Sequence, residues 1–548
     1  MTKVEGNIVD IHRREIYPGE IFISSTGIIE KIVRNEQRYG VYICPPFVDA
    51  HVHIESSMLL PQEFSRLVLK KGTVAIVNDP HEIANVLGEE GIEFMKKNAE
   101  KSEIKMFFSV PSCVPATPFD RSGKTIPAKS VEKLVTTQSF VALSEMMDVP
   151  GVLKEEKEVR RKLEIAKENH LKIDGHAPGL RGEDLKKYIA AGISTDHECI
   201  NLQEALEKIQ RGMKIIIREG SAAKNFEALH PLIGLYPQRI MFCTDDAHPD
   251  DIEEKGHIDR IVRMAVAKGY DLFDVLRAAS LNTINHYHLS VGSLKENEKA
   301  DFIKVKDLKS FQILSTYIDG IEKYPFKGSK LSNKEHKIKN TYLLNNFNHD
   351  AITKEQIQYD LKEGDFPVIE VTDGMLWTEK RIIKNQNEKI NFESDIKNDI
   401  LKIVYINRYQ NGKPQIAFIK GVGLKEGAFG STISHDSHNI LAIGCKDEDL
   451  TACINEIIKC KGALVVKNEK GLFSLPLPVA GIMSDQAADQ VINTYKKLNR
   501  ELSESEVALS SPFMTLGFMS LIVIPQLKIG EGGLFDYSQF SFIEEKKD

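Results

Sequence analysis

Short apolar runs alternate with amphipathic stretches along residues 45–286, and this alternation constrains the fold more than any other feature. The eight apolar runs lie at residues 47–49, 74–77, 105–108, 140–143, 171–173, 193–195, 214–217 and 240–242. Between them, stretches such as residues 155–170 and 201–212 repeat apolar residues near the helical period. Eight strand–helix units in about 240 residues match a (β/α)8 barrel. An open doubly wound sheet is the alternative, but no Gly-x-Gly-x-x-Gly motif follows the first run.

The segments on either side of the barrel predict further domains. Residues 1–44 and 287–330 contain short alternating runs, which we expect to form one small β domain from both flanks of the barrel. Residues 331–364 are rich in Lys, Asn and Asp and predict a connector. Residues 365–548 mix strand-like and helical stretches. The predicted fold class is therefore α/β: a (β/α)8 TIM-type barrel with a small composite β domain and a C-terminal α+β domain.

Histidines and carboxylates stand at the ends of most predicted barrel strands. His51 and His53 end the first strand two residues apart, so the alternation of a strand places both side chains on one side. A barrel gathers the carboxyl ends of all its strands around one mouth. The polar residues that end the later strands are Asp79, His81, Ser109, Glu145, His176, His197, Glu219 and Asp245. One polar residue at a strand end is ordinary loop chemistry, but so many at successive ends indicate a shared site.

Four of these histidines and two of the carboxylates form a nitrogen and oxygen donor set without a thiolate, which favours Mn, Fe or Zn. The predicted metal ligands are His51, His53, Glu145, His176, His197 and Asp245. The carboxylates allow two ions, with Glu145 in the middle of the barrel as the bridging ligand. Two ions could share a hydroxide and lower the pKa of water towards neutrality. Asp245 could also take the proton of the attacking water, so the residues predict a metal-dependent hydrolase.

Composition excludes several other classes of protein. The chain has 548 residues, a formal charge of -7 and no dense Lys/Arg cluster, so we expect no nucleic-acid partner. No apolar run approaches the ~20 residues of a membrane span, and the N-terminus lacks the core of a signal peptide. We therefore expect no membrane partner and a cytoplasmic location. Seven cysteines without a Cys-x-x-Cys pair argue against a disulfide framework. We further expect a small-molecule substrate and a homo-oligomer, a dimer.

The His-x-His opening, the single histidines on the fifth and sixth strands and the aspartate on the eighth resemble the amidohydrolase superfamily. Longer strings resemble, within it, the adenine deaminase family. These strings lie at residues 49–58, 79–86, 111–118, 174–179, 218–225, 244–246, 248–251, 256–260, 434–439 and 512–516. The resemblance runs nearly end to end, and such strings are far more specific than a lone His-x-His.

The resemblance implies hydrolysis of adenine to hypoxanthine and ammonia, a reaction of purine salvage. It implies a dinuclear centre of Mn²⁺ or Fe²⁺, and the donors are compatible with Zn²⁺. Many superfamily members bridge their metals with a carboxylated lysine, whereas this chain has Glu145 at that strand end. Hydroxide activated by the metal would attack C6 of adenine while an acid protonates N1, and the tetrahedral centre would then lose ammonia. Asp245 is expected to shuttle the protons.

Further residues are expected around this centre. Glu219 is expected to contact the purine or protonate N1, with a supporting anchor as the alternative. His248 is expected to hold the leaving group or the hydroxide. A third set is expected to bind substrate or to orient the ligands, with structural ion pairs as the alternative: Glu55, His81, Glu82, Ser221, His435 and His438. The last two lie in a polar loop, residues 427–439, for which a solvated turn is equally compatible.

Two other functions remain open from the residues. A related metal hydrolase could act on another aminopurine or on a cyclic amide, because folds and metal sites are reused across substrates. A catalytically silent binding protein would lack some ligands, yet all six are present. A nucleic-acid deaminase with a His/Cys/Cys zinc site is disfavoured, because the Pro-Cys-x-x-Cys signature is absent.

Overall fold

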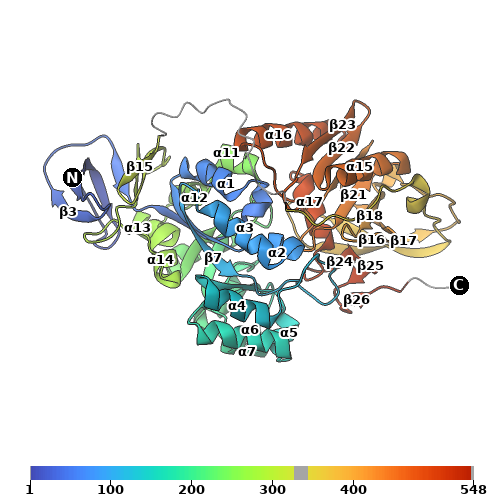
Figure 1. Cartoon of the computed structure of the whole chain (residues 1–548), viewed down its shortest axis with the longest axis horizontal. Coiled ribbons are helices and arrows are strands. Elements are labelled where there is room, and N and C mark those ends of the chain that lie inside the picture. Colours follow the sequence, from blue (N-terminus) through green and yellow to red (C-terminus); the bar gives the residue numbers. More distant parts are fainter. Residues whose placement is uncertain (1, 326–343, 545–548) are drawn as a thin grey trace.

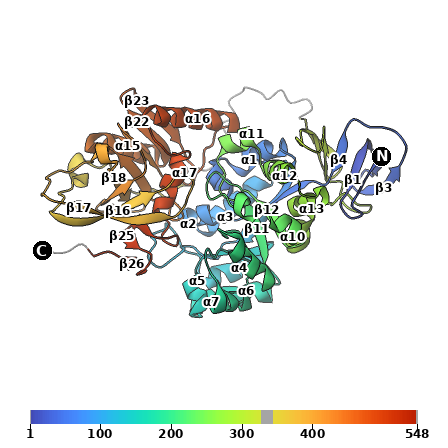
Figure 2. The same cartoon turned by 180° about the vertical axis from the view of Figure 1, so that it is seen from behind.

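The computed structural model describes residues 2–325 and 344–544 (Figure 1). The first part of the predicted connector, residues 331–343, lies outside the described residues. A central barrel separates a small β-sheet, which carries the N-terminus, from a C-terminal domain, and both views show the same order (Figures 1 and 2). In the described part of the chain, no helix is long and apolar enough to cross a membrane.

Eight parallel strands form the barrel, in one sheet of five and one of three. These strands are β5 (Phe47–Val52), β6 (Thr73–Asn78), β7 (Lys105–Val110), β8 (Ala142–Met146), β9 (Lys172–Gly175), β10 (Thr195–Asp196), β11 (Lys214–Arg218) and β12 (Ile240–Cys243). Between β9 and β10 the two sheets are joined by a hydrogen bond from Ser194 N to Ile173 O. Between β12 and β5 they are joined by a hydrogen bond from Asp245 N to His51 O. The predicted barrel is confirmed, because each apolar run overlaps one strand.

Helices cover the outside of this barrel. They are α1 (Pro61–Leu69), α2 (His81–Leu87), α3 (Glu89–Ala99), α4 (Ala128–Thr137), α5 (Val149–Leu153), α6 (Lys157–Glu168), α7 (Gly182–Ala190), α8 (Leu202–Gln210), α9 (Phe226–Leu229), α10 (Leu232–Leu235), α11 (Pro249–Lys255), α12 (Ile258–Ala267), α13 (Leu272–Leu276) and α14 (Asn282–Tyr287). In α6, Val159, Leu163 and Ala166 recur at helical spacing and are buried. Helix α8 begins where the Asn201 side chain accepts a hydrogen bond from Glu204 N.

The strands outside the barrel on its two flanks form one seven-stranded sheet. From one flank come β1 (Thr2–Asp10), β2 (Glu15–Ile23), β3 (Ile29–Arg34) and β4 (Tyr42–Cys44), and from the other β13 (Phe302–Val305), β14 (Ile313–Ile318) and β15 (Ile321–Tyr324). Strands β4 and β13 pair in antiparallel fashion and join the two groups. The small composite β layer that the fold class predicted is therefore present.

The C-terminal domain is built on an eight-stranded sheet with the order β17-β16-β19-β18-β21-β20-β22-β23. These strands are β16 (Gly364–Val371), β17 (Thr378–Asn385), β18 (Leu401–Ile406), β19 (Gln415–Lys420), β20 (Ala428–Ser431), β21 (Ile440–Gly444), β22 (Ala463–Asn468) and β23 (Gly471–Pro476). Helices α15 (Asp447–Cys460), α16 (Ala488–Glu504) and α17 (Pro512–Gly517) accompany this sheet. A separate small sheet contains β24 (Leu527–Gly530), β25 (Gly533–Asp536) and β26 (Ser541–Phe542).

The structure shortens the predicted polar loop at residues 427–439. Its first part is β20, an inner strand that pairs with β21 and β22, so only the residues from Thr432 to Asn439 form a loop. This remaining loop is buried rather than solvated, because it packs against the barrel. Asn439 Nδ2 donates to Arg121 O across the junction. The solvated turn is thereby excluded.

Candidate metal centre and substrate cavity

Glu145, at the end of β8, lies between two pairs of histidines. Its Oε1 is 3.3 Å from His53 Nε2 and 3.7 Å from His51 Nε2. Its Oε2 is 2.7 Å from His176 Nδ1 and 3.1 Å from His197 Nε2. All five side chains are buried. Each carboxylate oxygen thus faces a different histidine pair, which is the arrangement that a carboxylate bridging two cations requires.

Asp245 also contacts both sides of this centre. Its Oδ1 is 3.4 Å from His53 Nε2, and its Oδ2 is 3.5 Å from His197 Nε2. The residue has a φ of 55° just beyond β12, where its backbone is bonded to that of β5. Closure of the barrel between its first and last strands therefore brings Asp245 to His53, although 192 positions separate them in the chain, from 53 to 245.

The donors fit one or more divalent cations. His51, His53 and Asp245 offer ligand atoms within 4.8 Å of one another, and so do His51, Glu145 and His197. His51 Nε2 and His53 Nε2 face each other at 3.0 Å. Burial lowers the pKa of His51 well below its ordinary value, and the neighbouring histidines lower it further. Nitrogen and oxygen donors converging in this way suit Mn, Fe or Zn.

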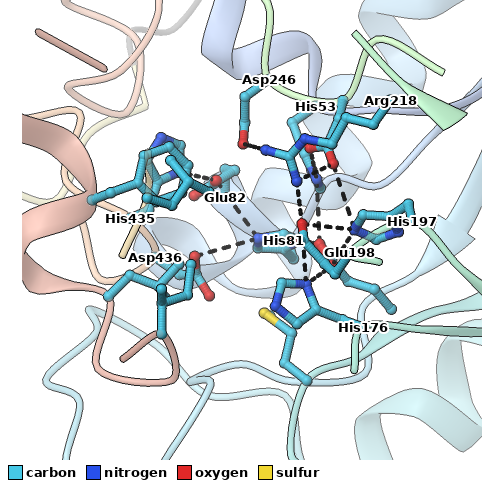
Figure 3. A pocket seen from close by; sticks show the side chains of 17 residues that line it. His53, His81, Glu82, His176, His197, Glu198, Arg218, Asp246, His435 and Asp436 are labelled. Carbon is cyan, nitrogen blue, oxygen red and sulfur yellow. Dashed lines mark hydrogen bonds and ion pairs between the residues drawn. The ribbon is translucent and has the colours of Figure 1, made fainter. Parts of the chain in front are cut away.

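Arg218, the last residue of β11, was missed by the sequence analysis, although it lines the cavity next to Asp245. Its Nη1 is 2.7 Å from Asp245 Oδ2 and also contacts Glu198, and its Nη2 is 3.5 Å from Asp246 Oδ2 (Figure 3). Ser56 Oγ donates to the other oxygen of Asp246 at 2.5 Å. The alternation of side chains along a strand could have revealed Arg218, because adjacent residues such as Arg218 and Glu219 face opposite sides.

Glu219, expected in catalysis, lies outside the cavity that Arg218 lines. Its Oε2 is 3.0 Å from Arg260 Nη2, and its Oε1 accepts a hydrogen bond from Phe226 N. The sequence analysis expected Glu219 at the mouth of the barrel, but the side chains of β11 alternate so that Arg218 faces the cavity and Glu219 faces away from it. Glu219 anchors α9 and α12 rather than the purine, which corresponds to the supporting role that the sequence left open.

His248, the second residue expected in catalysis, is also outside the cavity. Its Nδ1 is 2.6 Å from the Tyr495 hydroxyl, and its backbone N donates to Ser221 Oγ. Burial lowers the pKa of His248 to about 4. The structure therefore places both residues at the start of α11, where His248 contacts the C-terminal domain and Ser221 contacts the backbone of His248 within the barrel. Similarly, Glu55 Oε1 accepts from Ile83 N and holds the first turn of α2.

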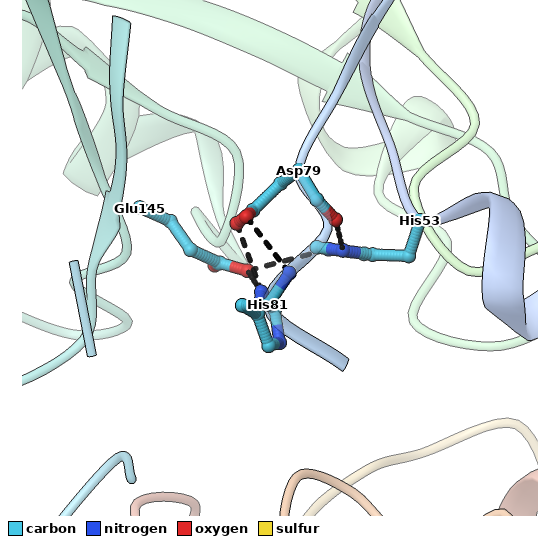
Figure 4. Close-up of side chains that lie close together, drawn as sticks. All are labelled: His53, Asp79, His81 and Glu145. Carbon is cyan, nitrogen blue, oxygen red and sulfur yellow. Dashed lines mark hydrogen bonds and ion pairs between the residues drawn. The ribbon is translucent and has the colours of Figure 1, made fainter. Parts of the chain in front are cut away.

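His81 and Glu82 do line the cavity, at the start of α2. His81 Nδ1 lies 2.8 Å from Asp79 Oδ2 and 3.6 Å from Glu145 Oε1 (Figure 4). Glu82 bonds through one oxygen to His435 Nδ1 and through the other to His438 Nε2. The structure thus brings both histidines of the C-terminal loop to the barrel, and His435 also lines the cavity.

The cavity has two different walls. The barrel supplies the charged wall and Met147, and the C-terminal domain supplies His435, Asp436 and the other apolar residues. The apolar lining consists of Met147, Leu376, Phe518, Leu521 and Ile524. A lining that is polar at one end and apolar along its side suits a small ring with polar edges.

Comparison with known proteins decides which family this is. Residues 42–322 match the amidohydrolase family, and residues 375–541 match the adenine deaminase C-terminal domain. The chain is 48% identical to an adenine deaminase of Methanosarcina mazei, over 99% of both chains, and 47% identical to one of Sulfurovum sp., again over 99% of both. An adenine deaminase of Borreliella burgdorferi is 44% identical over 99% of this chain and 100% of its own.

The chain belongs to the adenine deaminase family. Membership of this amidohydrolase family agrees with the clusters of His, Asp and Glu that could hold a metal ion. It also agrees with the long strings by which the sequence resembled the family. The amidohydrolase match covers the barrel, and the adenine deaminase match covers the C-terminal β-rich domain.

A buried lysine of this adenine deaminase family member holds two segments of the candidate metal centre together. Lys208 Nζ, on α8, donates at 2.7 Å to Asp196, to Glu204 and to the backbone oxygen of Ala177. Asp196 and Ala177 are the neighbours in sequence of His197 and His176. The ammonium therefore fixes two ligand-bearing loops in one position.

We expect Lys208→Met to destabilise the fold by about 3–5 kcal/mol, because removal of one partner leaves two buried carboxylates unpaired. Urea unfolding followed by circular dichroism measures this change. The matched control is Lys187→Met, because that side chain is 63% exposed and pairs with Asp184 only at the surface. A control change above about 0.5 kcal/mol, or equal stability of the two variants, would contradict the role given to Lys208.

Proposed function

We propose that this chain hydrolyses adenine to hypoxanthine and ammonia in the cavity next to Glu145. The observation that carries the proposal is the division of the two Glu145 oxygens between His51/His53 and His176/His197. The near full-length similarity to adenine deaminases supports adenine as the substrate. A related reaction on another aminopurine or on a cyclic amide is the second candidate, because the barrel ligands alone serve both.

We further propose that the centre holds two ions of Mn²⁺ or Fe²⁺, with Zn²⁺ also compatible with the donors. The residues that would hold them are His51, His53, Glu145, His176, His197 and Asp245. When bound, the metal would supply a Lewis acid that lowers the pKa of water towards neutrality. Burial of all six side chains keeps bulk water away from this chemistry.

Asp245 is the residue that we propose to move the proton. Its carboxylate would accept a proton from the attacking water and deliver it to the amino group at C6, so that ammonia can leave. Arg218 Nη1, 2.7 Å away, orients the carboxylate for this transfer. Glu198, which contacts the same guanidinium, also lines the cavity.

Metal removal tests this proposal directly. We expect the purified protein to release ammonia from adenine, to lose this activity after chelation, and to regain it with Mn²⁺ or, under anaerobic conditions, Fe²⁺. Adenosine, guanine and cytosine run alongside define the substrate. Release of ammonia from one of these compounds but not from adenine would overturn adenine as the substrate and leave a hydrolase of another ring. Full activity in metal-free protein would overturn the proposed metal centre.

The predicted dimer and the cytoplasmic location remain proposals as well. A homo-oligomer would elute with a mass that is a multiple of 61.7 kDa. Size-exclusion chromatography with light scattering measures this mass, and a single species of one chain would overturn the dimer.

A further inference from the structure

Asp436, in the loop of the C-terminal domain, presents a buried oxygen that the described residues leave without a hydrogen bond. The residue is 5% exposed and lines the cavity. Its Oδ1 lies 3.7 Å from His81 Nε2, whereas its Oδ2 has no hydrogen-bond partner among the described residues. Burying an unpaired carboxylate oxygen is costly. The oxygen is therefore expected to meet a donor that a ligand brings into the cavity.

The position of His81 shows how far Asp436 lies from the metal centre. One ring nitrogen, Nδ1, is 3.6 Å from Glu145 Oε1, and the other, Nε2, is 3.7 Å from Asp436 Oδ1. A single imidazole therefore spans the space between the two carboxylates. Figure 3 shows Asp436 and His435 facing the barrel side chains from the opposite side of the cavity. A planar fused ring lying along His81 would have one end at Glu145 and the other at Asp436.

We propose that Asp436 accepts the N–H of the five-membered ring of adenine and so selects the free base over its nucleoside. The inference rests on the proposed function, which places the amino group of adenine at the metal centre. Adenine has two kinds of N–H donor, the amino group and one ring N–H. With the amino group held at the reacting end, the ring N–H is the donor that remains for Asp436. In a nucleoside the sugar replaces that hydrogen, so Asp436 would stay unpaired and buried.

The loop that carries Asp436 is fixed before substrate arrives. Glu82 binds the histidines on either side of it, His435 and His438. Ser434 Oγ lies 2.7 Å from Ser520 Oγ, which joins the loop to the segment after α17. Such prior ordering lowers the entropy cost of binding and makes the position of the Asp436 carboxylate specific.

His435 adds a second polar atom beside Asp436. Its Nε2 is buried and has no hydrogen-bond partner among the described residues, and its ring stacks on Phe518 at 4.4 Å and 16°. Burial would lower the pKa of His435, but the carboxylate of Glu82 outweighs this effect and raises the pKa to about 9. At neutral pH Nε2 therefore carries a proton and can donate to a ring nitrogen. An acceptor and a donor on consecutive residues match the N–H and the neighbouring ring nitrogen of a purine.

The test compares adenine with 9-methyladenine on wild type, Asp436→Asn and Asp436→Ala. In wild type we expect kcat/KM for 9-methyladenine to be about 10⁴-fold lower than for adenine, since a site built to bind an N–H rejects an analogue without it. In Asp436→Ala we expect KM for adenine to rise about 100-fold with kcat within about 10-fold, because the contact is remote from C6. The ratio of kcat/KM for adenine to kcat/KM for 9-methyladenine should then fall by about 100-fold. Asp436→Asn, which keeps the shape of the side chain, should lie between the two.

The control is Ser437→Ala, because this neighbour contacts Asn439 and lies outside the lining of the cavity. We expect its kinetics to match those of wild type. An unchanged preference for adenine in both Asp436 variants, or a loss in kcat alone, would overturn the inference while wild-type turnover keeps the proposed function. One metal ion fewer per chain in the Asp436 variants would overturn it too, because Asp436 would then be a metal ligand. A wild type that is silent on adenine would overturn both proposals.

Discussion

Glu145→Gln is expected to reduce ammonia release from adenine by about 10³-fold or more and to lower the metal content of the purified protein. A glutamine offers one oxygen and one NH₂ group in place of two equivalent oxygens. Since one Glu145 oxygen faces His51 and His53 and the other faces His176 and His197, the amide nitrogen would point at one histidine pair. If the centre holds two cations as proposed, one of them would then lose Glu145 as a ligand.

The size of this effect follows from the role of the metal. A bound cation is worth several kcal/mol of transition-state stabilisation, and each 1.36 kcal/mol is tenfold in rate. Steady-state kinetics with elemental analysis of the same sample measures both changes. Cys243→Ser is the control, because Cys243 is buried in the barrel core and does not line the cavity. Wild-type turnover with two metal ions in Glu145→Gln would contradict a bridging role.

Asp245→Asn is expected to lower kcat by about 10²–10⁴-fold with most of the metal retained. The asparagine keeps an oxygen for the cation, but it cannot take a proton from water. It also replaces the charge that Arg218 Nη1 contacts at 2.7 Å, which leaves the buried guanidinium with Glu198 and Asp246 as its remaining partners.

Metal analysis separates the two possible reasons for this loss. If Asp245 moves the proton, the variant keeps its metal and loses kcat. If the residue only holds metal, activity returns when excess Mn²⁺ is added. Near-wild-type rates from a variant with full metal content would remove Asp245 from the proton transfer. Cys243→Ser is again the control, because it lies two residues before Asp245 in the same segment.

Much of the fold could be predicted from the sequence because its determinants are local. Each barrel strand is a short apolar run, and each covering helix repeats apolar residues at its own period, as Val159, Leu163 and Ala166 do in α6. The six candidate ligands could be proposed for a related reason. A barrel gathers all its carboxyl strand ends, so the order of His51, Glu145 and Asp245 along the chain was enough to bring them together.

The remaining residues could not be assigned in this way, because their positions depend on contacts distant in sequence. The choice between Arg218 and Glu219 depends on the phase of β11, which is set by the packing of β11 between its neighbours. His248 turned away from the cavity because Tyr495, 247 positions later, bonds its ring. A polar residue near a strand end is all that the sequence shows at these positions, and this could not reveal which of them faces the cavity.

The sequence by itself determined the barrel, its family and the six residues that converge on one centre, because period, residue type and strand order are properties of the chain. The tertiary structure decided what faces that centre. Glu82 binds His435 and His438 across 353 and 356 positions, and this contact makes the C-terminal loop a wall of the cavity. Asp436 gains its place opposite Glu145 only through that docking, because a pocket between two domains is defined by packing and not by local sequence.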